Sequence, residues 1–519
     1  MTLGSARSGT AVVRGWVRFT RGWAAWSCLA IAGWAAGPTN LVQLRGLLTE
    51  SLGQLKAPGA TWGVQVVNLS NGAVVYGANS DRLFVPASCT KLFTTALALE
   101  RLGPGFRVVT PLRAVGTVDA EGKLHGDLVW EGRGATDLGE RRSGSTAAAL
   151  APYVEAVVRA GIRQVEGTVV ADESWFRTTP YGPGWNWDDL VEAYGAGVSS
   201  LSFNDNLAHI RVQPGAEGQP VGIVAAPFPD VFRIVNRTRT GPANVPLHLR
   251  FERSPGSVEL LVSGTFPLGH GPYEENLAVP EPALTAGRAL RDALIQRGIS
   301  VRQPARVLTW RDRSTAGASG KWLGAVTSAP LTELVRDCLK PSQNLHAQLL
   351  LLQVGADVEN HSRPGETAGE TTDDSALAAL EQFLKSLGVS RSEFSWEEGS
   401  GLSRKNVVTP AATVRLLRHM AGHANPAIRA AWREALPIAG VDGTLKNRFT
   451  REPARGNLRA KTGSLRQIHA IAGYLDTLGG DHLALAIYLN GFVPADPRTS
   501  GRAEIDRVAE ILAAYPGRL

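Results

Sequence analysis

The chain has 519 residues, of which 44% are hydrophobic and 19% are charged, a composition typical of globular proteins and not of disordered ones. This length exceeds what one compact domain normally holds, so we expect two or three domains. The formal net charge is +7, but four positive charges are arginines among the first 37 residues, which hold no acidic residue, and without this segment the charge is about +3. The remainder has no lysine-rich run and no aromatic-basic stripe, so no nucleic-acid partner is indicated.

Residues 1–37 follow the pattern of a secretory signal peptide. The stretch VRGWVRFTRGW carries three arginines, and AAWSCLAIAGWAAG follows as a short apolar segment that ends in small residues before Pro38. The apolar part is short for a membrane-spanning helix. We therefore predict export to a periplasmic or other extracytoplasmic location, with an uncleaved N-terminal anchor or a mistaken start codon as alternatives. Peripheral association with the membrane and the oligomeric state stay open.

The cysteine content limits the sites that the exported chain can hold. Only Cys89 and Cys338 would remain after cleavage, too few for a disulfide-rich scaffold or a four-cysteine zinc site. Whether these two cysteines pair is left open by the sequence. We expect no metal ion and no cofactor.

The first part of the exported chain has the patterns of a helix, a hairpin and a second helix. Residues 41–55 are helical in pattern, and residues 61–81 contain two β-rich runs around an Asn-Gly pair, which is typical of a hairpin turn. The second helix starts near Ser88, carries apolar residues at helical spacing and stops at a Gly-Pro-Gly sequence.

The middle of the chain has a different predicted secondary structure from both ends. From residue 107 to 269 short β-rich runs alternate with turns, and a helix is expected over 283–297. The two ends together indicate an α+β body made of residues 41–106 and 300–519, into which residues 107–299 are inserted as a β-rich region with two expected subdomains. In the C-terminal part, helices are expected over 332–340, 342–355, 375–387, 410–419 and 502–515, and strands over 455–465, 468–477 and 482–492.

Three short motifs carry residue types that suit acyl transfer. Each has an ordinary structural explanation when taken alone: a serine that caps a helix, a solvated first turn, or an exposed lysine on a strand. All three together, in this order, are much harder to explain in that way. The motifs are S-x-x-K (Ser88 and Lys91), S-x-N (Ser342 and Asn344) and K-T-G (Lys461, Thr462 and Gly463).

The spacing of the first motif suits a nucleophile with its base. Ser88 and Lys91 lie one turn apart on one face of a helix. A serine hydroxyl needs a base to remove its proton, and lysine can be that base only if its pKa falls well below about 10.4. Burial and a second cation, Lys461, would both lower the pKa of Lys91. In the second motif, Ser342 can pass the proton to a leaving amine, and Asn344 can hold a substrate amide and orient Lys91.

The third motif has the chemistry of a carboxylate-binding strand. Lys461 and Thr462 offer a cation and a hydroxyl for a terminal carboxylate, and Gly463 lets a substrate backbone lie close to the strand. The backbone N–H groups of Ser88 and Ser464 are expected to form an oxyanion hole, which is usually the largest contribution to catalysis of acyl transfer.

This set resembles the type-4 penicillin-binding proteins, the D-alanyl-D-alanine carboxypeptidase/endopeptidase family of serine peptidases. Closely similar motifs occur in β-lactamases and penicillin-binding proteins. The long gap between Lys91 and Ser342 leaves room for the insert and argues against class A β-lactamases. The resemblance extends from residue 41 to the C-terminus and includes VPASCTKLFTTALALERLG, GWNWDDLVEAYGAGVSSLSFNDN, EEGSGLSRKNVVTP, LPIAGVDGTLKNRF and KTGSLRQIHAIAGYL.

The resemblance implies a serine D,D-peptidase/β-lactamase-like body, with a central antiparallel sheet flanked by helices and the insert between S-x-x-K and S-x-N. The implied substrate is a peptidoglycan stem peptide that ends in D-Ala-D-Ala, or a cross-link that ends in D-Ala, cleaved through an acyl-enzyme on Ser88. β-Lactams would acylate the same serine. The family's contacts to the diamino-acid side chain match Asp189, with Asp188 beside it, and Arg404. Alternatively, Asp189 caps a helix and Arg404 pairs with Glu398.

Two rival functions remain open. The rivals are another serine acyl hydrolase, either an esterase or a β-lactamase, and a non-catalytic murein-binding protein, against which the intact motifs argue. The balance between carboxypeptidase and endopeptidase action stays open.

Four features depart from the family pattern. The departures are Cys89 after the nucleophile, Glu398 in place of an aspartate, a degraded glycine-rich segment at 132–138, and the bulky Arg466 beside the expected pocket.

Overall fold

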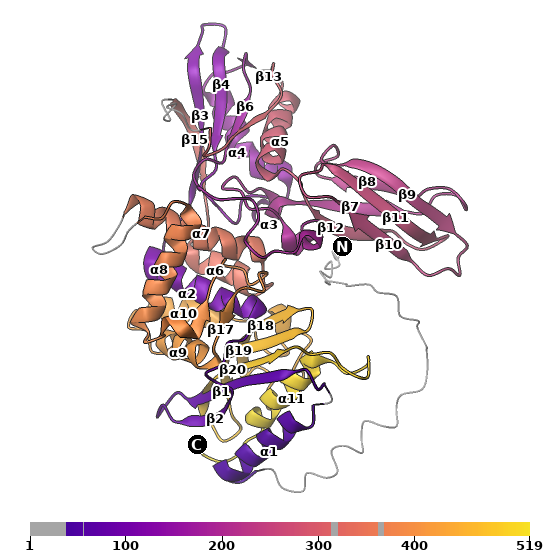
Figure 1. Ribbon diagram of the computed structural model, residues 1–519. Helices are drawn as coiled ribbons and strands as arrows, with labels where there is room; N and C mark the ends of the chain where they lie inside the picture. Colours follow the sequence, from indigo (N-terminus) through magenta and orange to yellow (C-terminus); the bar gives the residue numbers. More distant parts are fainter. Residues whose placement is uncertain (1–37, 56, 313–319, 362–367) are drawn as a thin grey trace.

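The computed structural model describes residues 38–55, 57–312, 320–361 and 368–519. The expected signal peptide or anchor, residues 1–37, lies outside the described residues. Figure 1 shows a body in which the segment from α1 (Leu41–Gly53) to α2 (Thr90–Leu102) meets the C-terminal segment of the chain, and a β-rich part built from the middle of the chain. No helix among the described residues combines the length and the apolar character needed to cross a bilayer.

The body contains a five-stranded antiparallel sheet in the order β18-β19-β20-β1-β2. The two N-terminal strands form the expected hairpin, and the three C-terminal strands join it through β20. The sheet therefore joins residues 61–78 to residues 458–490. Its strands are β1 (Thr61–Asn68), β2 (Val74–Ala78), β18 (Leu458–Leu465), β19 (Ile468–Asp476) and β20 (His482–Asn490).

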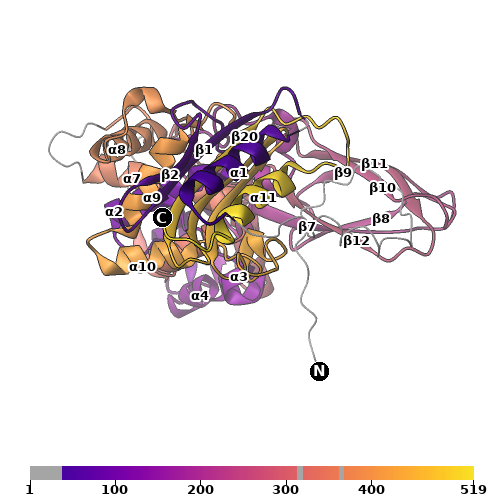
Figure 2. The same ribbon diagram turned by 90° about the horizontal axis from the view of Figure 1, so that it is seen from below.

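Different helices bury the two faces of this sheet. In β20, Leu483 and Leu485 pack in one core with α1 (Leu41–Gly53) and α11 (Gly501–Ala513), which lie next to each other in Figure 2. Ala484, between them in sequence, faces the opposite core. Successive side chains of a strand point to opposite faces, and burial of both faces explains why β20 is apolar along almost its whole length.

Six helices cover the other face of the sheet. They share one apolar core, in which α2, the helix that follows Ser88, packs directly against α7. The helix α10 was not predicted, although its Trp432 is completely buried. The six are α2 (Thr90–Leu102), α6 (Leu331–Leu339), α7 (Asn344–Asn360), α8 (Thr372–Ser386), α9 (Pro410–Ala421) and α10 (Pro426–Ala435).

The insert begins with a seven-stranded mixed sheet. Two helices, α4 (Thr146–Arg159) and α5 (Pro282–Gln296), pack against it; α4 was not predicted, because the region around it reads as β-rich. The strands are β3 (Val109–Val118), β4 (Lys123–Glu131), β5 (Gln164–Val165), β6 (Val169–Asp172), β13 (Ser300–Val301), β14 (Arg306–Leu308) and β15 (Lys321–Thr327).

The C-terminal boundary of the insert differs from the expected residue 299. β13 pairs with β5, β14 pairs with β6, and β15 pairs with β3. The strands between residues 300 and 327 therefore belong to the sheet of the insert, and the chain returns to the body at α6. These pairings join segments far apart in sequence, and side-chain packing against distant neighbours decides them more than local preference does.

A second β region of the insert extends to the right of the seven-stranded sheet in Figure 1. It consists of two three-stranded sheets, β12-β7-β8 and β10-β11-β9. One apolar core runs through this region and the seven-stranded sheet, so the division into two subdomains stays a prediction. The strands are β7 (Leu207–Gln213), β8 (Gly222–Ala226), β9 (Arg233–Gly241), β10 (His248–Glu252), β11 (Glu259–Pro267) and β12 (Tyr273–Ala278).

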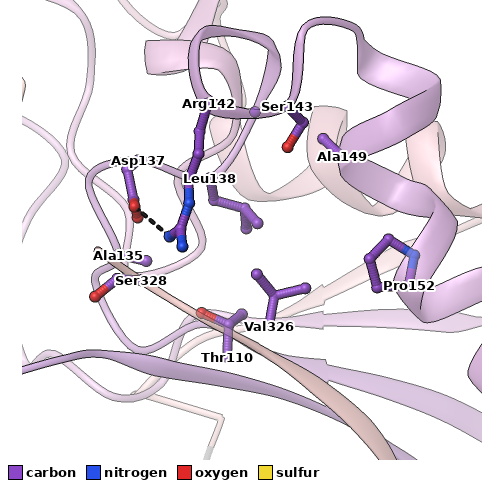
Figure 3. Close-up of a pocket in the computed structure, with 11 residues that line it drawn as sticks. Thr110, Ala135, Asp137, Leu138, Arg142, Ser143, Ala149, Pro152, Val326 and Ser328 are labelled. Atoms are coloured by element: carbon purple, nitrogen blue, oxygen red, sulfur yellow. Dashed lines mark hydrogen bonds and ion pairs between the residues drawn. The ribbon is translucent and has the colours of Figure 1, made fainter. Parts of the chain in front are cut away.

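A small cavity of about 100 Å³ lies in the insert, beside the segment that leads into α6 (Figure 3). Beside it, Asp137 forms an ion pair with Arg142 at 2.5 Å and accepts a hydrogen bond from the backbone N–H of Ala329, just before α6. Asp137 belongs to the segment 132–138 that departs from the family pattern. This departure therefore lies at the junction of the insert with the body.

Candidate active site

The three motifs meet between the body sheet and the helices. Lys91 Nζ lies 2.9 Å from Ser88 Oγ and 2.6 Å from Asn344 Oδ1. Lys461 Nζ lies 2.8 Å from Ser342 Oγ. The site thus contains two hydrogen-bonded groups at the N-terminal ends of α2 and α7. One group is Lys91 with Ser88 and Asn344, and the other is Lys461 with Ser342.

Ser88 occupies a 3-10 turn, η1 (Ala87–Cys89), that leads directly into α2. No side chain caps this turn or α2 by a hydrogen bond. Instead, Ser88 Oγ accepts a hydrogen bond from Lys91 Nζ, one helical turn further on. The interpretation of Ser88 as an ordinary capping serine is therefore wrong.

Lys91 has the surroundings of a general base. It is completely buried, and burial lowers its pKa to about 8, while the nearby Cys338 and Glu398 act in the opposite direction. Its Nζ also donates to the carbonyl oxygen of Ser400 at 2.5 Å. A lysine with a pKa of about 8 is neutral in a useful fraction of molecules near neutral pH, as a base must be.

The repulsion between the two lysines acts on Lys461. Burial, followed by the charge of Lys91, lowers the pKa of Lys461 to about 7. Repulsion between two nearby amines is reciprocal, so the pair loses its first proton more readily than either lysine would alone. Burial is the first cause of the lowered pKa of both lysines.

Ser342 and Asn344 lie at the start of α7 in an unusual backbone conformation. Ser342 has a φ of +68°, which is costly for a residue with a side chain and persists only where its surroundings enforce it. Gln343, and not Ser342, is the N-cap of α7 and makes no side-chain capping bond. Asn344 Oδ1 accepts from Lys91, and its Nδ2 donates to the carbonyl oxygen of Tyr194 at 2.8 Å. Asn344 therefore links the base to the insert.

The K-T-G motif lies on β18, which is an edge strand. Lys461 is completely buried, and Thr462 Oγ1 donates to Thr444 Oγ1 at 2.8 Å. The backbone N–H of Ala460 points out of the sheet to Pro437. Because N–H direction alternates along a strand, the N–H of Ser464 faces the same outer edge, where a substrate peptide or an oxyanion can accept from it.

Gly463 allows close backbone packing that the sequence did not predict. A Cβ atom there would lie 2.4 Å from the backbone oxygen of Pro86 and 3.1 Å from the Cβ of Ala87. Glycine thus lets β18 approach the turn that carries the nucleophile. Its expected contact with a substrate backbone stays a prediction.

Asp189 and Arg404 each form a hydrogen bond with a residue at the edge of the site. Asp189 accepts from the hydroxyl of Tyr194 at 2.9 Å, and the Tyr194 carbonyl accepts from Asn344. Asp189 ends a 3-10 turn, Trp187–Asp189, so it is not the N-cap of the helix considered above. Arg404 donates to the carbonyl oxygen of Arg466 at 3.0 Å and not to Glu398.

Glu398 organises the loop beside Lys91. Its side chain is completely buried and accepts from the backbone N–H groups of Ser400 and Gly401 and from Asn406 Nδ2. These bonds hold the Ser400 carbonyl against Lys91. The sequence marked Glu398 only as a departure from the family pattern and as an alternative partner of Arg404, and a backbone carbonyl such as that of Ser400 leaves no residue-type signal.

The two cysteines are free buried thiols, which resolves the question of their pairing. Cys89 Sγ lies 3.4 Å from the carbonyl oxygen of Lys461. Burial raises the pKa of Cys89 to about 12 and that of Cys338 to about 11. Both thiols are therefore protonated packing groups at neutral pH.

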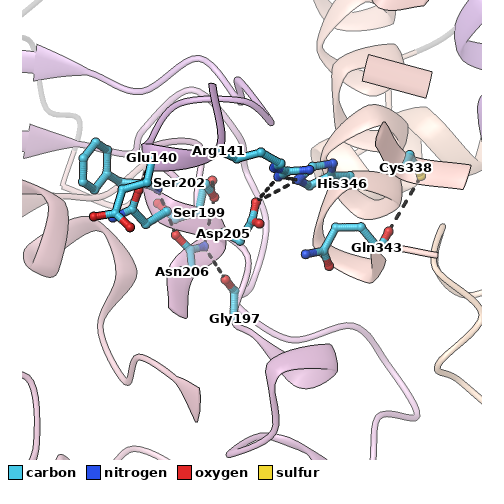
Figure 4. A network of polar contacts seen from close by, with 12 residues as sticks. Glu140, Arg141, Gly197, Ser199, Ser202, Asp205, Asn206, Cys338, Gln343 and His346 are labelled. Atoms are coloured by element: carbon cyan, nitrogen blue, oxygen red, sulfur yellow. Dashed lines mark hydrogen bonds and ion pairs between the residues drawn. The ribbon is translucent and has the colours of Figure 1, made fainter. Parts of the chain in front are cut away.

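A polar network joins the insert to α7 (Figure 4). His346 is buried two residues after Asn344, and its Nε2 lies 2.9 Å from Asp205 Oδ1 and 2.8 Å from an Arg141 nitrogen. Burial favours the neutral form of Asp205, but its bonds to His346 and Arg141 hold the pKa of Asp205 below its usual range. The sequence does not mark these three residues as functional, because none of them belongs to a recognisable motif without its partners.

Comparisons with known proteins agree with this geometry. Residues 44–512 match the sequence profile of the D-Ala-D-Ala carboxypeptidase 3 (S13) family. A D-alanyl-D-alanine carboxypeptidase of Actinomadura sp. (strain R39) is 32% identical over 499 residues, which cover 93% of this chain and 86% of the relative. The D-alanyl-D-alanine carboxypeptidase DacB of Haemophilus influenzae is 25% identical over 462 residues, which cover 88% of this chain and 91% of DacB.

The fold agrees as well. The crystal structure of penicillin binding protein 4 (dacB) from Haemophilus influenzae superimposes with a TM-score of 0.75 at 24% identity, covering 90% of this chain and 99% of that one. The expected α+β fold is therefore confirmed. Since the family profile spans nearly the whole chain, the protein belongs to the D-Ala-D-Ala carboxypeptidase 3 (S13) family, the type-4 penicillin-binding proteins that its motifs resemble.

Proposed function

We propose that Ser88 is the nucleophile of a serine D,D-peptidase that cleaves the terminal D-Ala-D-Ala bond, or a D-Ala cross-link, of peptidoglycan stem peptides. Membership of the family makes the chain a serine peptidase of the D-Ala-D-Ala carboxypeptidase type. The observation that carries the residue assignment is the buried amine of Lys91, 2.9 Å from Ser88 Oγ, with a pKa lowered to about 8.

Acylation begins when the neutral amine of Lys91 takes the proton from Ser88 Oγ. The oxygen attacks the carbonyl carbon of the penultimate D-Ala, and the developing oxyanion accepts hydrogen bonds from the backbone N–H groups of Ser88 and Ser464. As the bond between this carbon and the leaving nitrogen breaks, Ser342, hydrogen-bonded to Lys461, passes the proton that Lys91 took from Ser88 on to the nitrogen of the leaving D-Ala. Water then attacks the acyl-enzyme and releases the shortened peptide. β-Lactams acylate Ser88 by the same first steps.

Lys461 and Thr462 are suited to the carboxylate of the terminal D-Ala. In the free enzyme, the pKa of Lys461 is about 7, so the amine is partly neutral at pH 7. A bound carboxylate favours the charged amine and raises this pKa again. The site thus gains an ion pair only when a substrate with a free carboxylate arrives, which favours action at a peptide terminus or at a D-amino acid with a free carboxyl group.

Asp189 and Arg404 are proposed to hold the diamino-acid side chain of the stem peptide. Asp189 is linked to Asn344 through Tyr194, and Arg404 is bonded to Arg466, which follows the K-T-G strand. Asp189→Asn and Arg404→Gln should lower kcat/KM for muropeptides but leave acylation by penicillin unchanged. Equal losses with both substrates would contradict a role in side-chain recognition.

The decisive experiment is labelling of the nucleophile. Ser88→Ala should abolish labelling by a fluorescent penicillin, whereas Ser386→Ala, at an exposed serine of α8, should label like the wild type. Lys91→Ala should acylate at least about 100-fold more slowly, because general base catalysis contributes that much. Labelling that persists without Ser88 would show that the assigned nucleophile is wrong.

The site of action is proposed to be periplasmic, or otherwise outside the cytoplasm. Support comes from the signal-like pattern of residues 1–37 and from the location of peptidoglycan itself. Digestion of purified muropeptides, followed by mass spectrometry, would separate carboxypeptidase from endopeptidase action. Rapid turnover of the penicillin adduct, without cleavage of muropeptides, would instead favour a β-lactamase.

A further inference from the structure

A second group of chemically active side chains lies at the far end of α2. Glu100 is in the last turns of α2, His419 is at the C-terminal end of α9, and His423 follows that helix. Glu100 Oε1 lies 2.6 Å from His419 Nε2 and 2.9 Å from His423 Nε2. The group is about 14 Å along the helix from Lys91, so the proposed peptidase mechanism does not use it.

We propose that Glu100, His419 and His423 form a binding site for a transition metal ion of the zinc class. Two imidazole nitrogens and one carboxylate oxygen, with a fourth position left for water, are a donor set that zinc prefers. Their ligand atoms all lie within 4.8 Å of one another. Because metal–ligand bonds here are about 2 Å long, neighbouring ligand atoms of a tetrahedral site lie about 3.3 Å apart. The Glu100 oxygen, 2.6 Å and 2.9 Å from the two nitrogens, therefore needs to move away from them by about 0.4–0.7 Å to admit the ion.

The surroundings hold the ligands in place before any ion binds. The side chain of His423 is 10% exposed and that of Glu100 is 26% exposed. The two imidazole rings are nearly perpendicular, at 87°, and both direct Nε2 at the same oxygen. His423 Nδ1 accepts from the backbone N–H of Asn425 at 3.0 Å and lies 3.2 Å from the Asn425 carbonyl oxygen. That carbonyl can accept the ring proton when a metal takes Nε2, a partner typical of metal-bound histidine.

Neighbouring charges favour a transition metal over calcium or magnesium. His419 opens onto a hollow of about 700 Å³ that Arg415, Arg418 and Arg433 also line. Calcium and magnesium require several oxygen ligands, and this group offers a single carboxylate among arginines. Coordination by imidazole depends less on carboxylate charge, so zinc, nickel and copper are the ions that fit.

A bound ion would brace the helix that carries the nucleophile. It would cross-link the C-terminal turns of α2 to the end of α9, two elements that are far apart in sequence. An ion that binds only the folded state raises its stability by mass action. Binding of the ion at these three residues does not depend on whether Ser88 is the nucleophile.

The test uses the full exported chain without a polyhistidine tag, titrated with zinc chloride by calorimetry and by thermal unfolding. We expect one ion per chain and a higher Tm with zinc, but no shift with magnesium or calcium. His423→Ala and the conservative Glu100→Gln should weaken zinc binding by at least about tenfold, the lower end of what loss of an outer-shell partner alone costs. His125→Ala is the matched control, because His125 contacts two carboxylates, of Asp119 and Glu166, and no second histidine.

Cooperative thermal unfolding of each variant checks that it is folded, and this check does not depend on which residue is the nucleophile. The cobalt-loaded wild type should show the visible absorption of a tetrahedral site, and this absorption should be absent in folded Glu100→Gln. Absence of zinc binding in the wild type would overturn the proposal. Zinc binding that is unchanged in both folded variants would overturn it as well, because the ion would then lie elsewhere.

Discussion

At the scale of single residues, two buried lysines have different partners in the site. Lys91 faces the nucleophile and Lys461 faces Ser342, and burial lowers the pKa of both. An amine in water would be protonated at neutral pH and could not act as a base. Burial disfavours the charged form of a lysine and lowers its pKa. A larger fraction of the amines is therefore neutral near pH 7, as a general base must be.

The pH dependence of acylation should report the titration of Lys91. Below its pKa of about 8 the amine is mostly protonated and cannot accept the proton of Ser88. The rate constant for acylation by penicillin should therefore rise about tenfold per pH unit at acidic pH and level off near pH 8. Stopped-flow acylation between pH 5 and about 9 would measure it, and a flat profile would contradict the role of Lys91 as base.

The thiol beside the nucleophile should be inert in the folded enzyme. Cys89 and Cys338 are completely buried, and burial raises the pKa of both thiols. Since the thiolate is the reactive form, neither should react with a chromogenic disulfide reagent until the protein is unfolded in denaturant. Rapid reaction of Cys89 in the native enzyme would instead identify an open and reactive site beside Ser88.

At the scale of elements, the site depends on the contact between β18 and the turn η1. The strand supplies Lys461, the turn supplies Ser88, and the packing of Gly463 against Pro86 sets the distance between them. A side chain at Gly463 would have to push the strand away from the turn. The free edge of β18 beside this contact is where an extended peptide can add as a further strand.

Gly463→Ala should therefore damage both stability and chemistry. With a Cβ atom 2.4 Å from the Pro86 oxygen, we expect a loss of about 1–3 kcal/mol in the free energy of unfolding and slower labelling by penicillin. Urea unfolding and labelling kinetics would measure these two effects. Gly46→Ala in α1 is the control: no atom lies within 4 Å of its Cβ position, and it should stabilise the helix by about 0.5–1 kcal/mol.

At the scale of the whole molecule, the insert takes part in positioning the S-x-N motif. Asn344 donates to the carbonyl oxygen of Tyr194, and His346 bonds to Asp205, so two contacts from the insert reach the first turn of α7. A shift of the insert would thus be transmitted to Asn344 and, through it, to Lys91. This coupling makes the insert part of the site and not only a platform beside it.

Asp205→Asn tests that coupling. We expect a loss of about 1–3 kcal/mol in stability and acylation that is slower by up to about 100-fold, because small displacements of catalytic groups are costly. Glu259→Gln is the control, since Glu259 pairs with Arg233 at an exposed position of the insert and should change stability by less than about 0.5 kcal/mol. If Asp205→Asn acylates at the wild-type rate, the network is only structural.

Local patterns were sufficient for the helices and strands with strong periodicity. The hairpin of β1 and β2, the helix α2 and the three C-terminal strands follow from turn residues and apolar spacing. The helix α4 was missed within a β-rich texture, and α10 was missed although its Trp432 is buried. The boundary at residue 299 failed for a related reason, because strands such as β15 are assigned to a sheet by partners that are far away in sequence.

Residue types in a short fixed order determined the family and the three motifs, because nucleophile, base and cation are recognisable from chemistry and spacing alone. Only the tertiary structure decided that burial lowers the pKa of both lysines, which carbonyl accepts a hydrogen bond from Lys91 and which residues of the insert reach α7. Those properties depend on burial and on distances between segments that are remote along the chain. Burial and such distances arise only when the chain folds.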